Sequence, residues 1–315
     1  MRKKILITTC VLMIVTVSAQ AQWDYGFDFS KAGTAGLQFL KIGIGARESA
    51  MGEAAISTVE GINAIFWNPA GIASAQDREV AFTQNQWLLD IQHSAVAAAL
   101  RVGNIGVLGL SVIYLGLPEF EETTVQMQDG TGRMVSASDM ALGIAFARRF
   151  TNKLAMGGQV KYVQEKLDSD SFSNVLLDIG ALYHTGFRNI QIGVSAQHFG
   201  PDIKMLRDKF RMPLIFKVGI SDNLITSTLQ SLRLGIDLVH PTDNTERMNF
   251  GLEYGFAESV FIRSGYRMNS DLGKWSFGAG LAQNFMGIRG RVDYAYTDYG
   301  EIMGGVNRIT FILGF

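Results

Sequence analysis

Strict alternation of apolar and polar residues is the feature that most constrains the fold of this 315-residue chain. Between residues 247 and 254, the apolar residues Met248, Phe250, Leu252 and Tyr254 alternate with charged, polar or small residues. Successive side chains of a β-strand point to opposite faces, so this pattern predicts a strand with one apolar and one polar face. The same alternation recurs from about residue 79 onward.

The alternating runs number about fourteen, and most of them contain about ten residues or more. Strands of soluble proteins usually have about five or six residues, whereas a tilted strand needs about nine to eleven to cross a bilayer. Run length therefore favours a membrane barrel over a soluble sandwich. The expected strands cover residues 79–90, 91–102, 104–116, 134–149, 153–166, 172–185, 189–199, 211–221, 231–240, 245–255, 258–268, 274–285, 287–298 and 303–315.

The polar face of these runs favours the same architecture. It is dominated by small residues, and 35 of the 315 residues of the chain are glycine. A face in contact with water would carry many Lys and Glu, yet only 18% of the residues are charged. Small polar side chains suit the inside of a narrow barrel whose apolar face contacts membrane lipid. We therefore expect an all-β fold, in which residues 79–315 form a transmembrane antiparallel β-barrel of about fourteen strands.

Connection lengths alternate as they do in barrels with long outer loops and short periplasmic turns. The connections at 116–133 and 200–210 are long, whereas that at 150–153 is short. The connection at 222–231 is an exception, because it is longer than a periplasmic turn should be. The last run ends on Phe315, an aromatic residue that suits recognition by the machinery that inserts barrels into the outer membrane.

The first 21 residues have the features of an export signal. Three basic residues at 2–4 precede the apolar stretch 5–17, and small residues follow at Ala19 and Ala21. The apolar stretch is too short to span a bilayer comfortably, so residues 1–21 are expected to be a secretory signal peptide. Together with the barrel pattern, this predicts location in the outer membrane of a Gram-negative bacterium. The single cysteine, Cys10, would be removed with the signal.

The composition excludes several other classes of protein. The 28 basic residues nearly balance the 29 acidic ones, which gives no basic surface for a nucleic acid. A single cysteine excludes a disulfide scaffold and a cysteine-based zinc module. No histidine has a partner at helical spacing, and no catalytic motif stands out. We therefore expect no metal site, no cofactor and no enzymatic activity.

Residues 22–78 do not alternate and are expected to form a separate segment. They are too few for a domain with its own core, yet apolar residues such as Phe39, Ile44 and Ile65 make them unsuited to a free tail. One or two short helices are expected between residues 50 and 66, ending before Asn68 because the residue before a proline disfavours helix. We expect this segment to fill the barrel as a hatch, or plug, with residues 68–70 near the wall.

Three parts of this segment carry a resemblance to a known family. They are residues 39–47 (FLKIGIGAR), residues 50–54 (AMGEA) and residues 67–71 (WNPAG). Together they resemble the N-terminus of the PorV/PorQ family, which lies within the FadL-like superfamily of outer-membrane barrels. The resemblance implies a barrel with an N-terminal hatch. Its hatch motif corresponds to Trp67, Asn68, Pro69, Ala70 and Gly71.

The resemblance also implies one of two functions. The first is that of a non-enzymatic component of type IX protein secretion, which binds cargo proteins or a secretion translocon through its outer loops. The alternative is a FadL-like passive transporter, which carries a hydrophobic ligand across the outer membrane. We prefer the secretion hypothesis, because the outer loops are short for ligand capture. A third hypothesis, that the protein is a structural barrel with neither function, also stays open.

Two groups of residues are candidates for function. In the outer loop near 116–133, Phe120, Glu121 and Glu122 either bind a partner or belong to a solvated surface. A second group of charged residues lies on the expected inner face of the last six strands, where it either lines a pore, anchors the hatch or consists of paired charges filling a narrow lumen. This lumen charge cluster comprises Arg233, Asp237, Arg247, Glu253, Arg263, Arg267, Arg289, Arg291 and Asp293.

Overall fold

The structure, a computed structural model, describes residues 33–205 and 208–315. The expected signal peptide, residues 1–21, lies outside the described residues, as does the start of the expected hatch, residues 22–32. We use the name hatch below for residues 33–77, the described part of the chain before the first strand.

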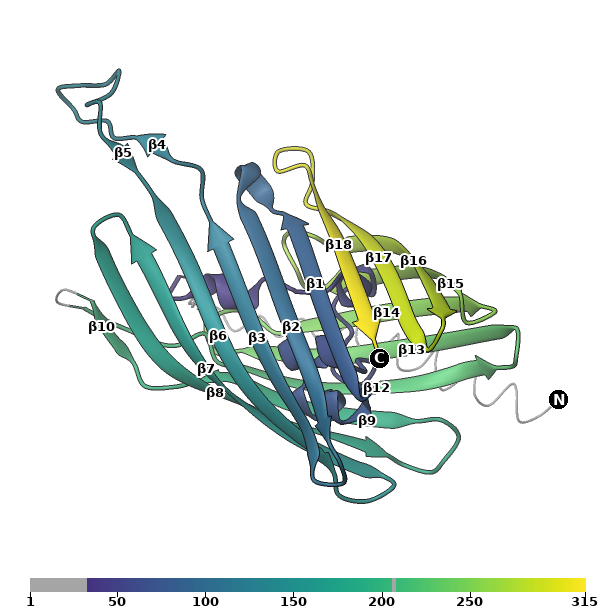
Figure 1. Ribbon diagram of the computed structural model, residues 1–315. Helices are drawn as coiled ribbons and strands as arrows, with labels where there is room; N and C mark the ends of the chain where they lie inside the picture. The colour runs from purple at the N-terminus through teal and green to yellow at the C-terminus, as the bar shows by residue number, and fades with distance from the viewer. Residues whose placement is uncertain (1–32, 206–207) are drawn as a thin grey trace, which may run out of the picture. The chain divides into compact units, whose positions relative to one another are not determined.

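Fourteen strands form a closed antiparallel barrel, which confirms the predicted fold (Figure 1). The barrel closes where the first strand pairs with the last, with Phe82 opposite Phe311. The strands are Arg78–Gln86 (β1), Gln92–Val102 (β2), Gly106–Gly116 (β3), Ala137–Arg149 (β6), Leu154–Leu167 (β7), Asp170–His184 (β8), Gln191–Phe199 (β9), Ile215–Thr226 (β12), Gln230–Pro241 (β13), Arg247–Phe256 (β14), Val260–Met268 (β15), Trp275–Phe285 (β16), Ile288–Asp298 (β17) and Gly305–Gly314 (β18).

The two longest connections, 117–136 and 200–214, lie at the same end of the barrel, but long and short connections do not alternate strictly. The β7–β8 turn at that end contains only residues 168–169, whereas the β8–β9 connection at the opposite end contains residues 185–190. Two long loops contain small hairpins of their own. One is formed by Phe120–Glu121 (β4) and Met134–Val135 (β5), and the other by Ile203–Met205 (β10) and Asp208–Phe210 (β11). The end with the two longest loops corresponds to the outer face of an outer-membrane barrel, and the opposite end to the periplasmic face.

The expected exception to this alternation, at residues 222–231, is wrong. Strand β12 continues to Thr226, so its turn to β13 contains only residues 227–229. The pairing of these two strands shifts between Asn223 and Ile225. Such an irregularity changes which face each side chain occupies, and it therefore hides the end of the strand from a count based on strict alternation.

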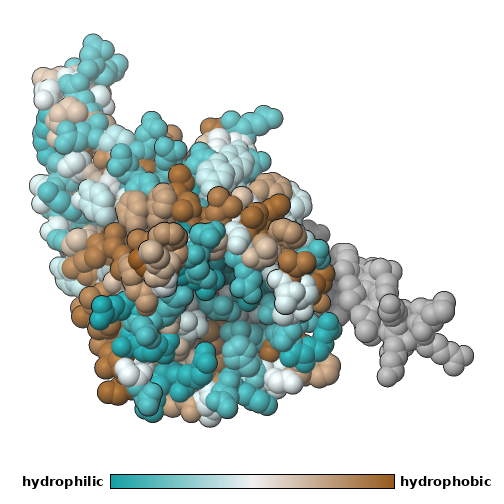
Figure 2. All heavy atoms as spheres, turned by 45° about the vertical axis from the view of Figure 1, so that its right-hand side comes forward, coloured by the Kyte–Doolittle hydropathy of each residue, from teal (hydrophilic) through white to brown (hydrophobic). Residues whose placement is uncertain are grey.

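The side chains alternate between lipid and lumen along each strand. On β1, Phe82 exposes 42% of its surface, whereas its neighbours Ala81 and Thr83 are buried inside. Apolar side chains gather in a band across the barrel wall, with hydrophilic side chains above and below it (Figure 2). This is the pattern of a barrel whose middle contacts hydrocarbon. Among the described residues, no helix is long and apolar enough to cross a membrane.

The hatch consists of short helical turns inside the barrel (Figure 1). They are Gln38–Lys41 (η1), Ala46–Ala50 (α2), Ile62–Phe66 (η2) and Pro69–Ser74 (η3); a further turn, Leu88–Asp90 (η4), lies between β1 and β2. The helix expected between residues 50 and 66 is thus confined to its last turn, and residues 51–61 form turns. Pro69 begins a helical turn, a position where its missing N–H costs no hydrogen bond.

Candidate functional site

The hatch motif, Trp67 to Gly71, fixes the hatch to one side of the wall. The Asn68 side chain is fully buried and donates to the carbonyl oxygens of Ile56, at 2.9 Å, and of Ala181 on β8, at 3.2 Å. Its own oxygen accepts from the Ala70 N–H at 3.2 Å. Asn68 therefore joins two parts of the hatch to a wall strand. The expected position of residues 68–70 near the wall agrees with these contacts.

The remaining residues of the motif support this arrangement. The Trp67 indole donates to the carbonyl oxygen of Ile44 at 2.7 Å, which ties the motif to an earlier part of the hatch. A methyl group added at Gly71 would lie 2.7 Å from the Ala64 side chain and 2.8 Å from the Val59 carbonyl oxygen. Residue 71 must therefore be small because two other hatch residues occupy the space around it.

Paired glycines in the wall make room for this contact. Gly157 on β7 and Gly180 on β8 are opposite each other in the sheet. A methyl group on Gly157 would lie 2.6 Å from the backbone of Pro69, and one on Gly180 would collide with the Asn68 side chain. The backbone of the hatch thus sits in a notch that only glycine leaves open.

Similar glycine notches occur elsewhere around the inner wall. Gly251 and Gly265 are paired on β14 and β15, and methyl groups there would collide with the backbone of Met51 and Gly52. Gly193 and Gly219 are paired on β9 and β12 and pack against Ile56. The abundance of small residues on the predicted inner face therefore has a specific cause, since the hatch backbone packs directly on the sheet.

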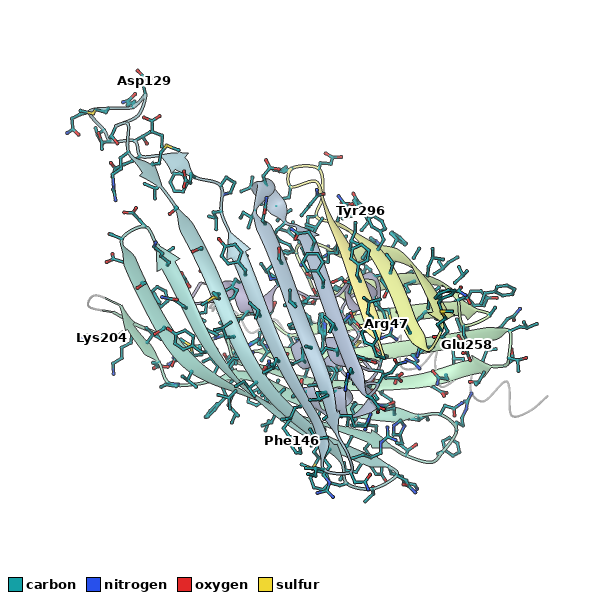
Figure 3. All side chains as sticks on the ribbon, in the orientation of Figure 1. Arg47, Asp129, Phe146, Lys204, Glu258 and Tyr296 are labelled. Carbon is teal, nitrogen blue, oxygen red and sulfur yellow. The ribbon has the colours of Figure 1, made fainter. Side chains whose placement is uncertain are left out.

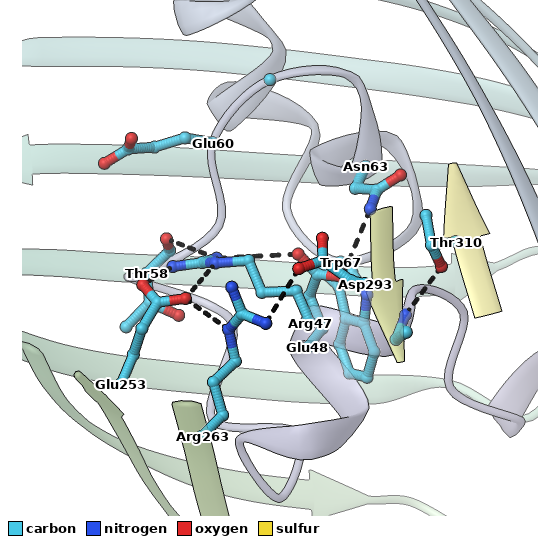
Figure 4. Close-up of polar contacts among 12 residues, drawn as sticks. Arg47, Glu48, Thr58, Glu60, Asn63, Trp67, Glu253, Arg263, Asp293 and Thr310 are labelled. Carbon is cyan, nitrogen blue, oxygen red and sulfur yellow. Dashed lines mark hydrogen bonds and ion pairs between the residues drawn. The ribbon is translucent and has the colours of Figure 1, made fainter. Parts of the chain in front are cut away.

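An ion-pair network joins the hatch to the opposite wall (Figure 4). Arg47, in α2, binds Glu253 on β14 through two hydrogen bonds of 2.8 Å. Glu253 also accepts from Arg263 on β15 at 2.6 Å, and Arg263 donates to Asp293 on β17 at 2.8 Å. Asp293 also accepts a hydrogen bond from Arg291 at 2.7 Å. The network is buried, so its charges interact strongly and must remain paired.

Glu48, next to Arg47, is a further buried carboxyl group beside this network. Its carboxylate lies 3.6 Å from the Arg47 guanidinium and 3.4 Å from the side-chain nitrogen of Asn63. Burial raises the pKa of Glu48 above its ordinary value, and the neighbouring Arg47 offsets only part of that effect. The folded protein therefore favours the protonated form of Glu48 more than the unfolded chain does.

Other members of the predicted cluster contact the hatch separately. Arg267 is paired with Glu53 of the hatch at 3.1 Å. Asp237 accepts from the Ile56 N–H at 2.8 Å, and Arg233 lies 3.4 Å from Glu60. These contacts support the interpretation that the lumen charges anchor the hatch, and they also satisfy the requirement that buried charges be paired.

Two residues of the predicted cluster belong neither to the network nor to these separate pairs. Arg289 is exposed at the periplasmic end of β17, so the structure does not bring it to the other charges. Arg247 lines a small internal cavity, together with Lys217 on β12. Among the ion pairs of the described residues, none involves Arg247 or Arg289.

A buried polar group on the other side of the lumen was not among the residues expected from the sequence. Lys161 on β7 is paired with Asp178 on β8 at 2.7 Å and contacts His198 on β9 at 2.7 Å. His198 has a φ of 65°, and the β8–β9 pairing is irregular beside it. As a result, both Gln197 and His198 are buried, although adjacent strand residues usually face opposite sides. Lys161 and Asp178 occupy inward positions of their strands, so the alternation could have identified these two.

The predicted partner-binding loop is a projecting hairpin, whose tip is marked by Asp129 in Figure 3. Phe120 is paired with Val135 across β4 and β5 and exposes 53% of its surface. Glu121 accepts from the Gly132 N–H at 2.7 Å, and Glu122 is paired with Arg133 at 3.0 Å. Phe120 is therefore available to a partner, whereas both carboxylates hold the hairpin together.

No group of three or more potential ligand residues is placed to hold a metal ion within residues 33–205 and 208–315. The contacts described above consist instead of ion pairs, backbone hydrogen bonds and close packing. This arrangement can anchor a plug and present an outer surface.

The barrel is similar to solved outer-membrane channels. The toluene transporter TodX of Pseudomonas putida matches with a TM-score of 0.58 and 13% identity, over 86% of this chain and 97% of that chain. A FadL homologue of Pseudomonas aeruginosa matches with a TM-score of 0.55 and 11% identity, over 85% and 96%. The monoaromatic hydrocarbon channel CymD gives 0.55 and 12%, over 87% and 98%. No curated protein sequence shows significant similarity to the chain.

Fold and hatch together define a fourteen-stranded β-barrel whose fold is similar to that of FadL-type outer-membrane channels. The family model described as type IX secretion system protein PorV matches residues 28–187, which is just over half of the chain. The chain therefore belongs to the PorV family of type IX secretion proteins. Proteins of this family and fold are outer-membrane secretion components and channels.

Proposed function

We propose that this protein is a non-enzymatic binding component of type IX secretion, which captures cargo or a translocon partner at its outer face. The observation that carries the proposal is the anchored hatch. Arg47 holds it to one wall and Asn68 to the other, both through buried hydrogen bonds. The small cavity beside Trp67 has a volume of only about 30 Å³. A lumen filled in this way favours binding of partners at the outer surface over passage of molecules through the barrel.

The hairpin at residues 117–136 is the proposed contact surface. Three of its apolar side chains are exposed: 86% for Val125, 57% for Met127 and 53% for Phe120. Exposed apolar clusters of this kind favour contact with another protein. Arg133 is bonded to both Glu122 and Asp168, which ties the hairpin to the β7–β8 turn. A preformed hairpin binds with a smaller loss of conformational entropy than a flexible one.

Transport of a hydrophobic small molecule is the second candidate function. Its support is the fold, which is shared with TodX and CymD, and the apolar cluster in the outer half of the lumen, which includes Phe39, Leu40 and Ile113. Transport would require the hatch to leave its contacts with Glu253 and the β7–β8 wall, because these contacts close the lumen. The two functions therefore make different demands on the same hatch.

The test is a deletion strain complemented with hairpin variants. The triple variant Phe120→Ser, Val125→Ser, Met127→Ser removes the exposed apolar surface and keeps Glu121 and Glu122. We expect it to reach the outer membrane as a heat-modifiable barrel and to fail in delivering secreted proteins to the cell surface. The matched control is Leu89→Ser with Ile302→Ser, two exposed residues in other outer loops. Normal secretion in the triple variant, with loss of hydrophobic uptake in the deletion strain, would establish transport instead.

A further inference from the structure

The small cavity beneath η1 is lined by both apolar and charged side chains. Its apolar lining comes mainly from the hatch, with Ile42, Ile44 and Trp67. Its charged lining comes largely from the barrel, with Lys161, Lys217 and Arg247. The hatch thus covers a group of cations that would otherwise face the outer half of the lumen. Buried cations require compensation, so the partners of each one are informative.

Most of the charged side chains around this cavity have a partner of opposite charge. Lys41 is paired with Asp243 at 2.8 Å, and Lys161 with Asp178 at 2.7 Å. The carboxylate of Glu53 is paired with Arg267 at 3.1 Å. Each of these pairs is neutral as a unit. They leave no further carboxylate at ion-pair distance from the remaining cations that line the cavity.

Lys217 and Arg247 are those remaining cations. Among the described residues, neither makes an ion pair, and the buried Nε of Arg247 has no hydrogen-bond acceptor. The ammonium of Lys217 lies over the ring of Trp67, 4.9 Å from its centre, which is a favourable but uncharged contact. A guanidinium and an ammonium therefore line the same small cavity, and neither has a carboxylate partner of its own.

The nearby carboxylates do not balance this charge. Burial by itself raises the pKa of Glu53, but the positive charges of Arg267, Arg247 and Lys217 outweigh it and hold that pKa below its ordinary value. Asp237 also acts on Lys217 electrostatically, although it does not line the cavity. Three cations and two carboxylates leave one positive charge in excess, even when both carboxylates are ionised.

We propose that this cavity binds one small monovalent anion of halide size, which is chloride in the cell. Lys217 and Arg247 would bind it from the barrel wall, and the apolar residues of the hatch would exclude water around it. The size follows from the volume of about 30 Å³, compared with the roughly 150 Å³ of a cavity that accepts benzene. A carboxylate with an apolar chain does not fit. The anion would act as a structural counterion between hatch and barrel.

The test uses the full-length protein, purified in detergent with gluconate as the only small anion. Bromide is added at constant ionic strength, and the temperature of barrel unfolding is followed by heat-modifiable gel migration. We expect a saturable rise in unfolding temperature. Crystals containing bromide should give one anomalous-difference peak between Lys217 and Arg247. Stabilisation that does not saturate, together with no peak at this position, would mean that the cavity holds water only and would overturn the proposal.

Two variants separate this site from general salt effects. Lys217→Met and Arg247→Met each remove one positive charge at similar side-chain length, and we expect each to weaken the apparent bromide affinity at least tenfold. Arg289→Met is the matched control, since Arg289 is exposed and outside the cavity. Equal bromide effects in all three variants would overturn the proposal. If a cavity variant fails to fold, the anomalous peak in the unaltered protein decides the question alone.

Discussion

Arg47 in the hatch and Glu253 in the wall form two parallel hydrogen bonds of 2.8 Å, between Nε and Oε2 and between Nη2 and Oε1. Paired bonds of this kind fix direction as well as distance, because the planar guanidinium matches the planar carboxylate. Glu253 simultaneously accepts from Arg263 on the neighbouring strand. The position of the hatch and the pairing of β14 with β15 are thus coupled through one carboxylate.

Replacement of Arg47 by Met should loosen the hatch. The change leaves Glu253 buried with one fewer cation, and removing one partner of a buried pair costs roughly 3–5 kcal/mol. We expect a lower unfolding temperature and faster protease cleavage of the hatch. Arg47→Lys should recover only part of the loss, because an ammonium cannot form both bonds. Arg233→Met, at a pair whose Glu60 side chain is 53% exposed, is the control and should change little.

A methyl group at Gly265 should disturb the hatch more than one elsewhere on the barrel. It would collide with the backbone of Gly52, which cannot move aside as a flexible side chain can. Overpacking of this kind costs roughly 1–3 kcal/mol. The control is Gly290→Ala, where the added methyl would have no neighbour closer than 3.9 Å. Equal unfolding temperatures for the two alanine variants would contradict the notch interpretation.

Asn68→Ala should separate the hatch motif from β8. It removes the acceptor for the Ala70 N–H and the donor for the carbonyls of Ile56 and Ala181. Each buried group left unpaired costs roughly 1–3 kcal/mol. We expect faster amide hydrogen exchange in residues 68–74, measured by mass spectrometry. Asn152→Ala, in an exposed turn, should leave that exchange unchanged.

Glu48→Gln should stabilise the protein more at high pH than at low pH. Because the pKa of Glu48 is raised in the folded state, wild-type stability falls as pH rises from the ordinary value of 4.5 through the folded pKa. Glutamine has no proton to lose and escapes this loss. The unfolding temperatures of the two proteins should therefore converge near pH 4 and diverge above it. If the difference in unfolding temperature between the two proteins does not change with pH, Glu48 does not titrate between the folded and unfolded states as expected.

The strands and their inward faces could be predicted because alternation is a local property. Residues such as Asp237, Glu253 and Arg263 were expected on the inner face from their positions within single runs, and all three are buried. Where a bulge breaks the alternation, local reasoning fails, as at Asn223 in β12 and His198 in β9. An extra residue in a bulge exchanges the inward and outward positions that follow it, and the sequence pattern does not show where such a residue lies.

The contacts between hatch and wall could not be predicted in the same way. Arg47 and Glu253 are separated by 206 residues, and nothing in either local sequence specifies the other. The hatch itself was recognisable as a segment that does not alternate, but its turns follow from packing against the barrel and not from helix propensity. The exposed position of Arg289 also depends on how far β17 extends beyond the hatch, which alternation does not reveal.

The glycine notches have a consequence for biogenesis. They lie on strands spread around the circumference, from Gly157 on β7 to Gly265 on β15, and each receives a different part of the hatch backbone. A finished barrel would have to admit all of these parts together through one end. We therefore expect the sheet to fold around the N-terminal segment. The pairing of β1 with β18, which closes the barrel, would then form last. Substitutions in the notches should therefore lower the yield of inserted barrel as well as its stability.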